Sequence, residues 1–173
     1  MNSLPTLTGE RADLAQTLAR HREFLRFTAR DLTDEQAAQR TTASELCVGG
    51  IIKHVTGVER QWSRFITEGP AAMGTWQDQD AMQAWRDGFK MLPGETVTDL
   101  LVDYQAAAAQ TDALLASLPD LDASQPLPAA PWYEPGATWS ARRVLLHIIA
   151  ETSQHAGHAD IIRESIDGAK TMG

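Results

Sequence analysis

The chain has 173 residues, 43% of them hydrophobic, with a net charge of −8 and a pI near 5.0. This length suits a single domain, residues 1–173, and the acidic balance excludes a nucleic-acid-binding surface, which needs a basic face. The start of the chain lacks a signal-peptide pattern, and no stretch reaches the roughly 18 apolar residues of a membrane span. One cysteine, Cys47, excludes an internal disulfide. These features predict a cytoplasmic protein.

Helical spacing of apolar residues begins near the start of the chain. Residues 9–32 carry leucines and phenylalanines at this spacing, which predicts a first helix. We expect Thr8 to be its N-cap, because a hydroxyl there can accept a bond from a free amide of the first turn. A break follows, in which Thr33 and Gln36 have the spacing of a capping box.

A second long helix is predicted over residues 48–66, ending near Gly69. Its apolar residues recur at intervals of three, four and seven, and His54 lies in the same segment. Residues 78–91 predict a short helix that ends at a Pro-Gly pair.

The second half of the chain predicts two more long helices. Residues 96–118 combine leucines with an alanine cluster, which favours helix. Residues 119–138 contain five of the eight prolines and predict a loop. The last helix should begin near Trp139-Ser140 and run to Ile166, with Gly168 in the left-handed position after its end. No stretch alternates as a strand would, so we predict an all-α fold, a four-helix bundle with long crossover loops.

A stripe of metal-capable side chains lies on this last helix. At about 100° per residue, and with His147 at zero, Glu151 falls near 40°, His155 near 80° and His158 near 20°. Imidazole and carboxylate groups are usual ligands of zinc and related divalent ions, and residues three or four apart can converge on one ion. A further ligand must come from another helix, where His54 is the candidate.

A competing interpretation is that these histidines are ordinary core or surface residues. For a lone histidine that interpretation is the better one, and we apply it to His21, which lies among charged residues. Four metal-capable groups on one stripe favour a metal site instead. Trp132 and Tyr133 lie in the proline-rich loop, where packing needs an aromatic side chain less, and are candidates for lining a pocket.

Two segments resemble the DinB-like superfamily, which includes metal-dependent S-transferases that use low-molecular-weight thiols. Residues 52–62 (IKHVTGVERQW) are similar to the family's second-helix pattern of a histidine followed by an acidic and an aromatic residue. Residues 145–158 (LLHIIAETSQHAGH) are similar to its last-helix pattern, in which two metal-binding positions four apart precede a glycine. The layout of helices agrees over most of the chain.

Carried over by position, the resemblance implies that His54, Glu151 and His155 are metal ligands. The commonest family pattern has histidine at the position of Glu151, whereas relatives resembling mycothiol-dependent maleylpyruvate isomerase have glutamate. His158, where many relatives have glutamine, is assigned a catalytic role as a base or orienting group, with a role as a fourth ligand left open. Zinc is the expected metal, with nickel, manganese and iron as alternatives.

The resemblance implies a metal-dependent S-transferase or thiol-dependent isomerase, with a thiol such as mycothiol as cosubstrate and a small electrophile as its partner. A non-catalytic metal-binding module, acting in a stress response or in ligand binding, is the alternative. A structural bundle without metal is a third interpretation. Relatives often pair through helix faces, so a homodimer is expected.

Overall fold

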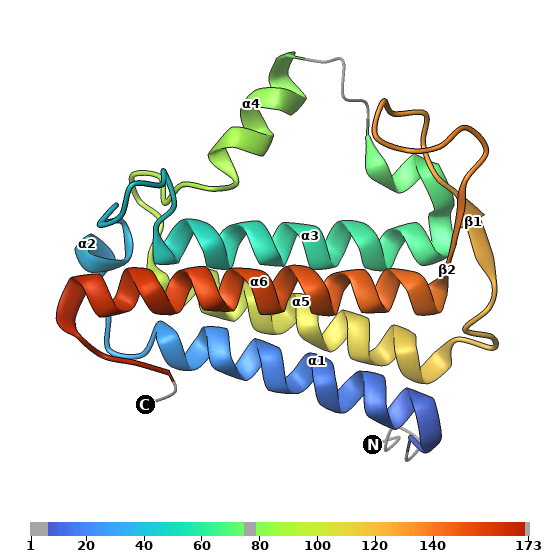
Figure 1. Ribbon diagram of the computed structural model, residues 1–173, viewed down its shortest axis with the longest axis horizontal. Helices are drawn as coiled ribbons and strands as arrows, with labels where there is room; N and C mark the ends of the chain where they lie inside the picture. Colours follow the sequence, from blue (N-terminus) through green and yellow to red (C-terminus); the bar gives the residue numbers. More distant parts are fainter. Residues whose placement is uncertain (1–6, 75–78, 172–173) are drawn as a thin grey trace.

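The structure, a computed structural model, describes residues 7–74 and 79–171 and is mostly helical (Figure 1). Its long helices are α1 (Gly9–Thr28), α3 (Val48–Glu68), α5 (Val97–Ser117) and α6 (Ala141–Asp167). The shorter elements are α2 (Asp34–Ala37), the 3-10 helix η1 (Gly69–Met73), α4 (Gln79–Asp87), β1 (Ser124–Pro126) and β2 (Thr138–Ser140). The prediction of an all-α fold is therefore confirmed in its main feature.

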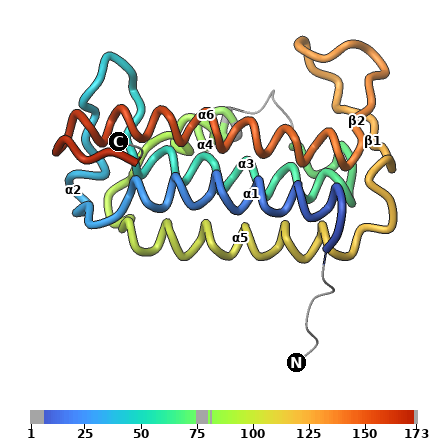
Figure 2. The backbone as a smooth tube through the Cα atoms, turned by 60° about the horizontal axis from the view of Figure 1, so that its bottom comes forward, coloured from blue at the N-terminus to red at the C-terminus, as the bar shows by residue number. Residues whose placement is uncertain are grey.

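The long helices lie side by side, with α3 against both α5 and α6 and with α1 against α6 (Figures 1 and 2). Helices α3 and α5 run in one direction, whereas α1 and α6 run in the other (Figure 1). Because α3 and α5 run in the same direction, the chain has to return along the whole length of α3 before α5 begins. The return includes α4, which passes over α3 (Figure 1).

Most of the observed helix ends lie close to those predicted from the sequence. The capping box of Thr33 and Gln36 is confirmed, and so is Gly168, whose φ of 79° is left-handed. Helix α1 ends at Thr28 rather than at residue 32, because the chain turns at Asp31, whose φ of 58° lies outside the helical region. Thr8 is the N-cap residue as expected, but its side chain makes no capping hydrogen bond.

The prediction that no segment forms a strand was wrong. Strands β1 and β2 pair antiparallel, with Gln125 opposite Trp139, and thereby close the proline-rich loop into a ribbon. Three-residue strands are too short to show an alternating pattern in the sequence. The last helix begins at Ala141, next to the predicted start, and the hydroxyl of its N-cap Ser140 accepts a hydrogen bond from the Arg143 amide. The helix predicted over residues 78–91 corresponds to α4, which ends at Asp87 rather than at residue 91. Its expected start at residue 78 lies outside the described residues.

The apolar core has two parts, one toward each end of the long helices. One part lies around Leu18, Phe65 and Leu145, and the other around Leu25, Ile51 and Ala159. Polar side chains lie between these two parts along the helices. No helix in residues 7–74 or 79–171 is long and apolar enough to cross a membrane.

Candidate functional site

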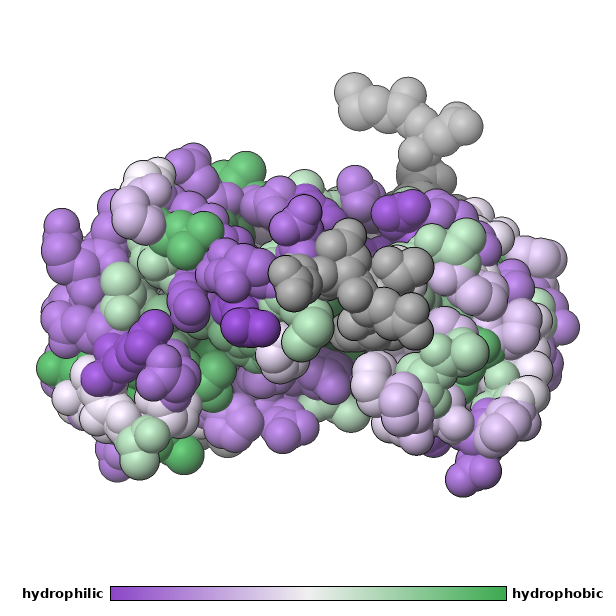
Figure 3. All heavy atoms as spheres, turned by 90° about the horizontal axis from the view of Figure 1, so that it is seen from above, coloured by the Kyte–Doolittle hydropathy of each residue, from purple (hydrophilic) through white to green (hydrophobic). Residues whose placement is uncertain are grey.

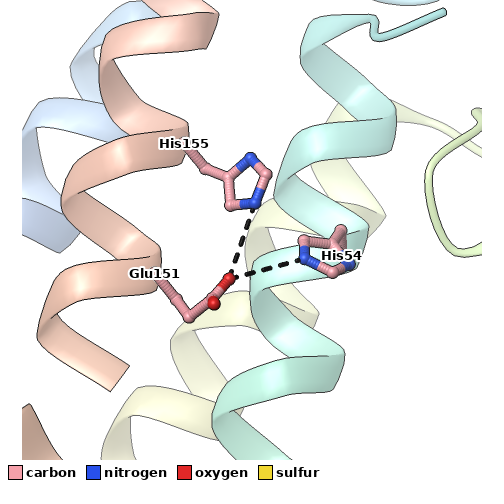
Figure 4. Close-up of side chains that lie close together, drawn as sticks. All are labelled: His54, Glu151 and His155. Carbon is pink, nitrogen blue, oxygen red and sulfur yellow. Dashed lines mark ion pairs between the residues drawn. The ribbon is translucent and has the colours of Figure 1, made fainter. Parts of the chain in front are cut away.

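Three of the predicted site residues converge between α3 and α6. Glu151 and His155 are one turn apart on α6, and His54 reaches them from α3 (Figure 4). His155 Nε2 lies 3.6 Å from Glu151 Oε2, and His54 Nε2 lies 3.9 Å from the same oxygen. One potential ligand atom from each residue lies within 4.8 Å of the other two. The packing of α3 on α6 thus brings together side chains that are almost one hundred residues apart.

These separations are longer than hydrogen bonds, which need about 2.7–3.2 Å between nitrogen and oxygen. They are close to the spacing of ligands around one ion. Ligand atoms about 2.1 Å from zinc, at tetrahedral angles, lie about 3.4 Å from one another. Two imidazoles and a carboxylate also form the donor set that zinc and its neighbours prefer. The residues present therefore fit a divalent cation, and three of them would leave positions open.

The charge state of Glu151 also suits a cation. The His155 ring, and after it the His54 ring, lower the pKa of this carboxyl well below its usual range, although burial opposes them. Glu151 is therefore an ionised carboxylate at neutral pH. A partly buried carboxylate surrounded by imidazoles is an electrostatic environment that favours a positive ion.

A cavity of about 1060 Å³ opens beside this cluster. His54, Glu151 and His155 line it, together with residues of α4 and of the β1–β2 loop. Lys53 and Arg60 of α3 line it as well, each paired with a carboxylate, Glu95 and Asp103 respectively. The face carrying α4 and this loop is mostly polar, with small groups of apolar residues (Figure 3). The cavity has room for a molecule much larger than a metal ion.

The two other histidines of α6 lie in different surroundings. His147 lines the cavity, with Nε2 3.8 Å from Glu151 Oε1, and its ring packs edge-on against Trp62. Burial lowers the pKa of its imidazole, a shift that Glu151 opposes. His158 is not among the cavity-lining residues, and its ring centre lies 5.4 Å from that of His155. The proposed catalytic role of His158 stays a prediction.

Sequence reasoning placed some lining residues correctly and missed others. Trp132 and Tyr133 line the cavity as expected. His147 was on the predicted stripe but received no role, because angles on a helix do not show where a cavity lies. Phe89 was missed altogether, although its ring stacks on His54 with centroids 3.9 Å apart. It lay within the helix predicted over residues 78–91, but α4 ends at Asp87, and no motif or family pattern marked this residue.

Fold and site together define a DinB-like helical protein with a cluster of potential metal ligands at the edge of a cavity. The model of the family described as Mycothiol-S-transferase matches residues 13–168, and the chain belongs to this family. A solved structure, titled "Crystal structure of the conserved protein of locus from Enterococcus faecalis", is also similar. It shares 16% identity, covers 94% of this chain and 100% of its own, and superposes with a TM-score of 0.67. This likeness supports the fold alone. No curated protein matches the chain.

Proposed function

We propose that this protein is a metal-dependent S-transferase that uses a low-molecular-weight thiol such as mycothiol. The observation that carries the proposal is the cluster of His54, Glu151 and His155 at the wall of a large cavity, in a member of the mycothiol S-transferase family. The four long helices then form the four-helix bundle of DinB-like proteins. We include a cytoplasmic location and a homodimer in the proposal, as expected from the sequence.

Each of the three residues has a defined part in this proposal. His54 and His155 would supply neutral nitrogen donors, and Glu151 would supply the negative charge that offsets part of the ion's charge. A divalent cation held there, zinc first among the candidates, favours the thiolate form of a thiol at an open position. The thiol would lose its proton to solvent, and its sulfur would form a bond to an electrophilic carbon of the substrate. In a substitution that carbon expels a leaving group with the bonding electrons; in an addition the electron pair moves to the neighbouring atom, which takes up a proton.

Other side chains would organise the cavity around the reacting groups. The Trp62 and His147 rings would form part of the cavity wall beside Glu151. We propose His158 as a group that acts on the orientation of His155, because its ring adjoins His155 and does not line the cavity. The thiol and the electrophile would occupy the cavity between α3, α4 and the β1–β2 loop.

The second candidate function is metal binding without turnover, in a stress-response or ligand-binding module. A closed site with four protein ligands and no neighbouring space would favour it. The cavity beside Glu151 favours the enzyme instead, because a site for turnover must admit two reactants.

The decisive experiment combines metal analysis with a thiol-transfer assay. Protein purified without an affinity tag is analysed for metal and then incubated with monochlorobimane and mycothiol, bacillithiol or glutathione. We expect stoichiometric divalent metal and a metal-dependent acceleration that is greatest with mycothiol. The acceleration should disappear in His155→Ala and persist in His21→Ala, whose side chain lies on α1 and does not line the cavity.

The outcomes separate the two functions. Bound metal without acceleration by any of the three thiols supports the metal-binding module and contradicts the transferase. Absence of metal, together with unchanged behaviour of His155→Ala, contradicts both and leaves a structural bundle.

A further inference from the structure

We propose that Phe89 is a positioning residue that holds the His54 imidazole in its metal-binding orientation. The inference rests on the proposed function, since it assigns a role toward the proposed metal ligand. The Phe89 and His54 rings lie nearly parallel, with an interplanar angle of 21° and centroids 3.9 Å apart. This is a stacked contact over one face of the imidazole, and such aromatic pairs have a preferred geometry.

His54 lacks the support that a ligating histidine usually has. A histidine ligand normally donates its second ring N–H to a carboxylate, a carbonyl or water, which fixes the ring plane. For residues 7–74 and 79–171, the structure gives neither ring nitrogen of His54 a hydrogen bond to a neighbouring group. Its ion-pair partner Glu151 lies at 3.9 Å and is itself a proposed ligand. The His155 ring meets His54 edge-on, with centroids 4.7 Å apart, and the stacked Phe89 ring is the contact that covers a face of the imidazole and limits its rotation.

The sequence makes room for this contact at one glycine of α3. A Cβ at Gly50 would overlap the backbone carbonyl of Phe89 and lie 2.9 Å from the Lys90 nitrogen. The obstacle is backbone, so it cannot swing aside as a side chain would. Gly50 therefore permits the chain beyond α4 to lie directly on α3. Because Gly50 is one helical turn before His54, the same close approach carries the Phe89 ring onto the imidazole.

Phe89 also connects His54 to the wall of the cavity. The Trp85 ring of α4 packs edge-on against Phe89, with centroids 5.1 Å apart, and both aromatic residues line the cavity. The backbone turns at this point, with the Phe89 amide donating a hydrogen bond to the Arg86 carbonyl. The orientation of His54 thus depends on a segment outside the four long helices.

The experiment measures metal binding rather than turnover. Co²⁺ is titrated into metal-free wild type, Phe89→Leu, Phe89→Tyr and Gly50→Ala, and its visible absorption reports both affinity and ligand geometry. We expect Phe89→Leu to weaken binding by about tenfold, the lower end of the loss seen when groups that orient a ligand are removed, and to change the spectrum. Gly50→Ala should do the same by displacing the Phe89 backbone. Phe89→Tyr keeps the ring and should behave as wild type.

Matched controls keep the proposal separate from the metal site itself. Gly157→Ala is the control for adding a methyl group to a helix near the site, because a Cβ there meets nothing within 4 Å. The positioning role would be overturned if Phe89→Leu bound Co²⁺ with the affinity and spectrum of wild type while His54→Ala did not bind it. Unchanged binding in His54→Ala would overturn the proposed metal site and the positioning role together. If Gly50→Ala does not fold, the comparison of leucine with tyrosine at position 89 decides.

Discussion

Two polar clusters among the described residues lie between the apolar ends of the core, and they differ in one respect. In the first, the buried Arg22 guanidinium donates to both carboxylate oxygens of buried Glu59, at 2.5 and 3.3 Å. In the second, the carboxylate of Glu151 has the rings of His54 and His155 at 3.9 and 3.6 Å, beyond hydrogen-bonding distance. The side chains of the first cluster are hydrogen-bonded to one another. The potential ligand atoms of the second cluster are too far apart for hydrogen bonds.

The difference indicates that the first cluster stabilises the fold and that the second is available to bind a ligand. The Arg22 guanidinium is paired within the protein, with buried Glu59 and with the more exposed Asp112, so it needs no ligand from outside, and its pair with Glu59 connects α1 to α3. A carboxylate with imidazoles at ligand spacing, open to a cavity, would be completed by a cation from solution if the proposed function is correct. Breaking the first cluster should therefore reduce folding stability, and breaking the second should reduce metal binding.

The largest effect is expected from Arg22→Met, which leaves Glu59 buried without its partner. Removing one member of a buried ion pair destabilises a protein by about 3–5 kcal/mol. The free energy of unfolding from urea titrations, measured without metal, checks this. The double variant Arg22→Met with Glu59→Leu should recover most of the loss, because no charge then remains buried. A loss below about 1 kcal/mol in the single variant would show that the pair is not the structural cluster.

His54→Ala and His155→Ala should act on the second cluster alone. Each should leave the stability of the metal-free protein near wild type and remove the stabilisation that metal provides. At a metal concentration one hundred times Kd, that stabilisation is about 2.7 kcal/mol. Thermal unfolding with and without Zn²⁺ measures it. Metal-induced stabilisation that persists in His54→Ala would contradict a site shared by α3 and α6.

Glu151→Gln should have a smaller effect than either histidine variant. The amide oxygen can still act as a ligand, but the negative charge that offsets part of the cation's charge is lost. We expect metal affinity between those of wild type and His155→Ala, measured by competition with a chelator of known affinity. Affinity equal to wild type would remove Glu151 from the ligand set.

The smallest effect is expected from His158→Ala. A group that orients a ligand typically contributes about tenfold or somewhat more to metal affinity, so the site should remain occupied at saturating metal. Metal content after dialysis, together with the thiol-transfer rate, tests this. If His158→Ala empties the site while Glu151→Gln does not, then His155 and His158 are the ligand pair and the assignment of Glu151 is wrong.

Much of the fold was accessible from the sequence because its signals are local. Apolar spacing marked all four long helices, and the Thr33 capping box and Gly168 were identified from a few neighbouring residues. The β1–β2 ribbon was not, because its strands are short and their pairing joins residues such as Gln125 and Trp139 across a proline-rich loop. The end of α1 was misplaced because nothing in the local pattern showed the left-handed turn at Asp31.

The sequence by itself determined that Glu151 and His155 share one side of a helix, because 3.6 residues per turn fixes that relation wherever the helix lies. Only the tertiary structure decided that His54 meets them. It also decided that His147 lines the cavity and that Phe89 covers the face of His54. Those relations join separate elements, and packing sets them. One helix can rotate or slide against another without any change in its own pattern of residues.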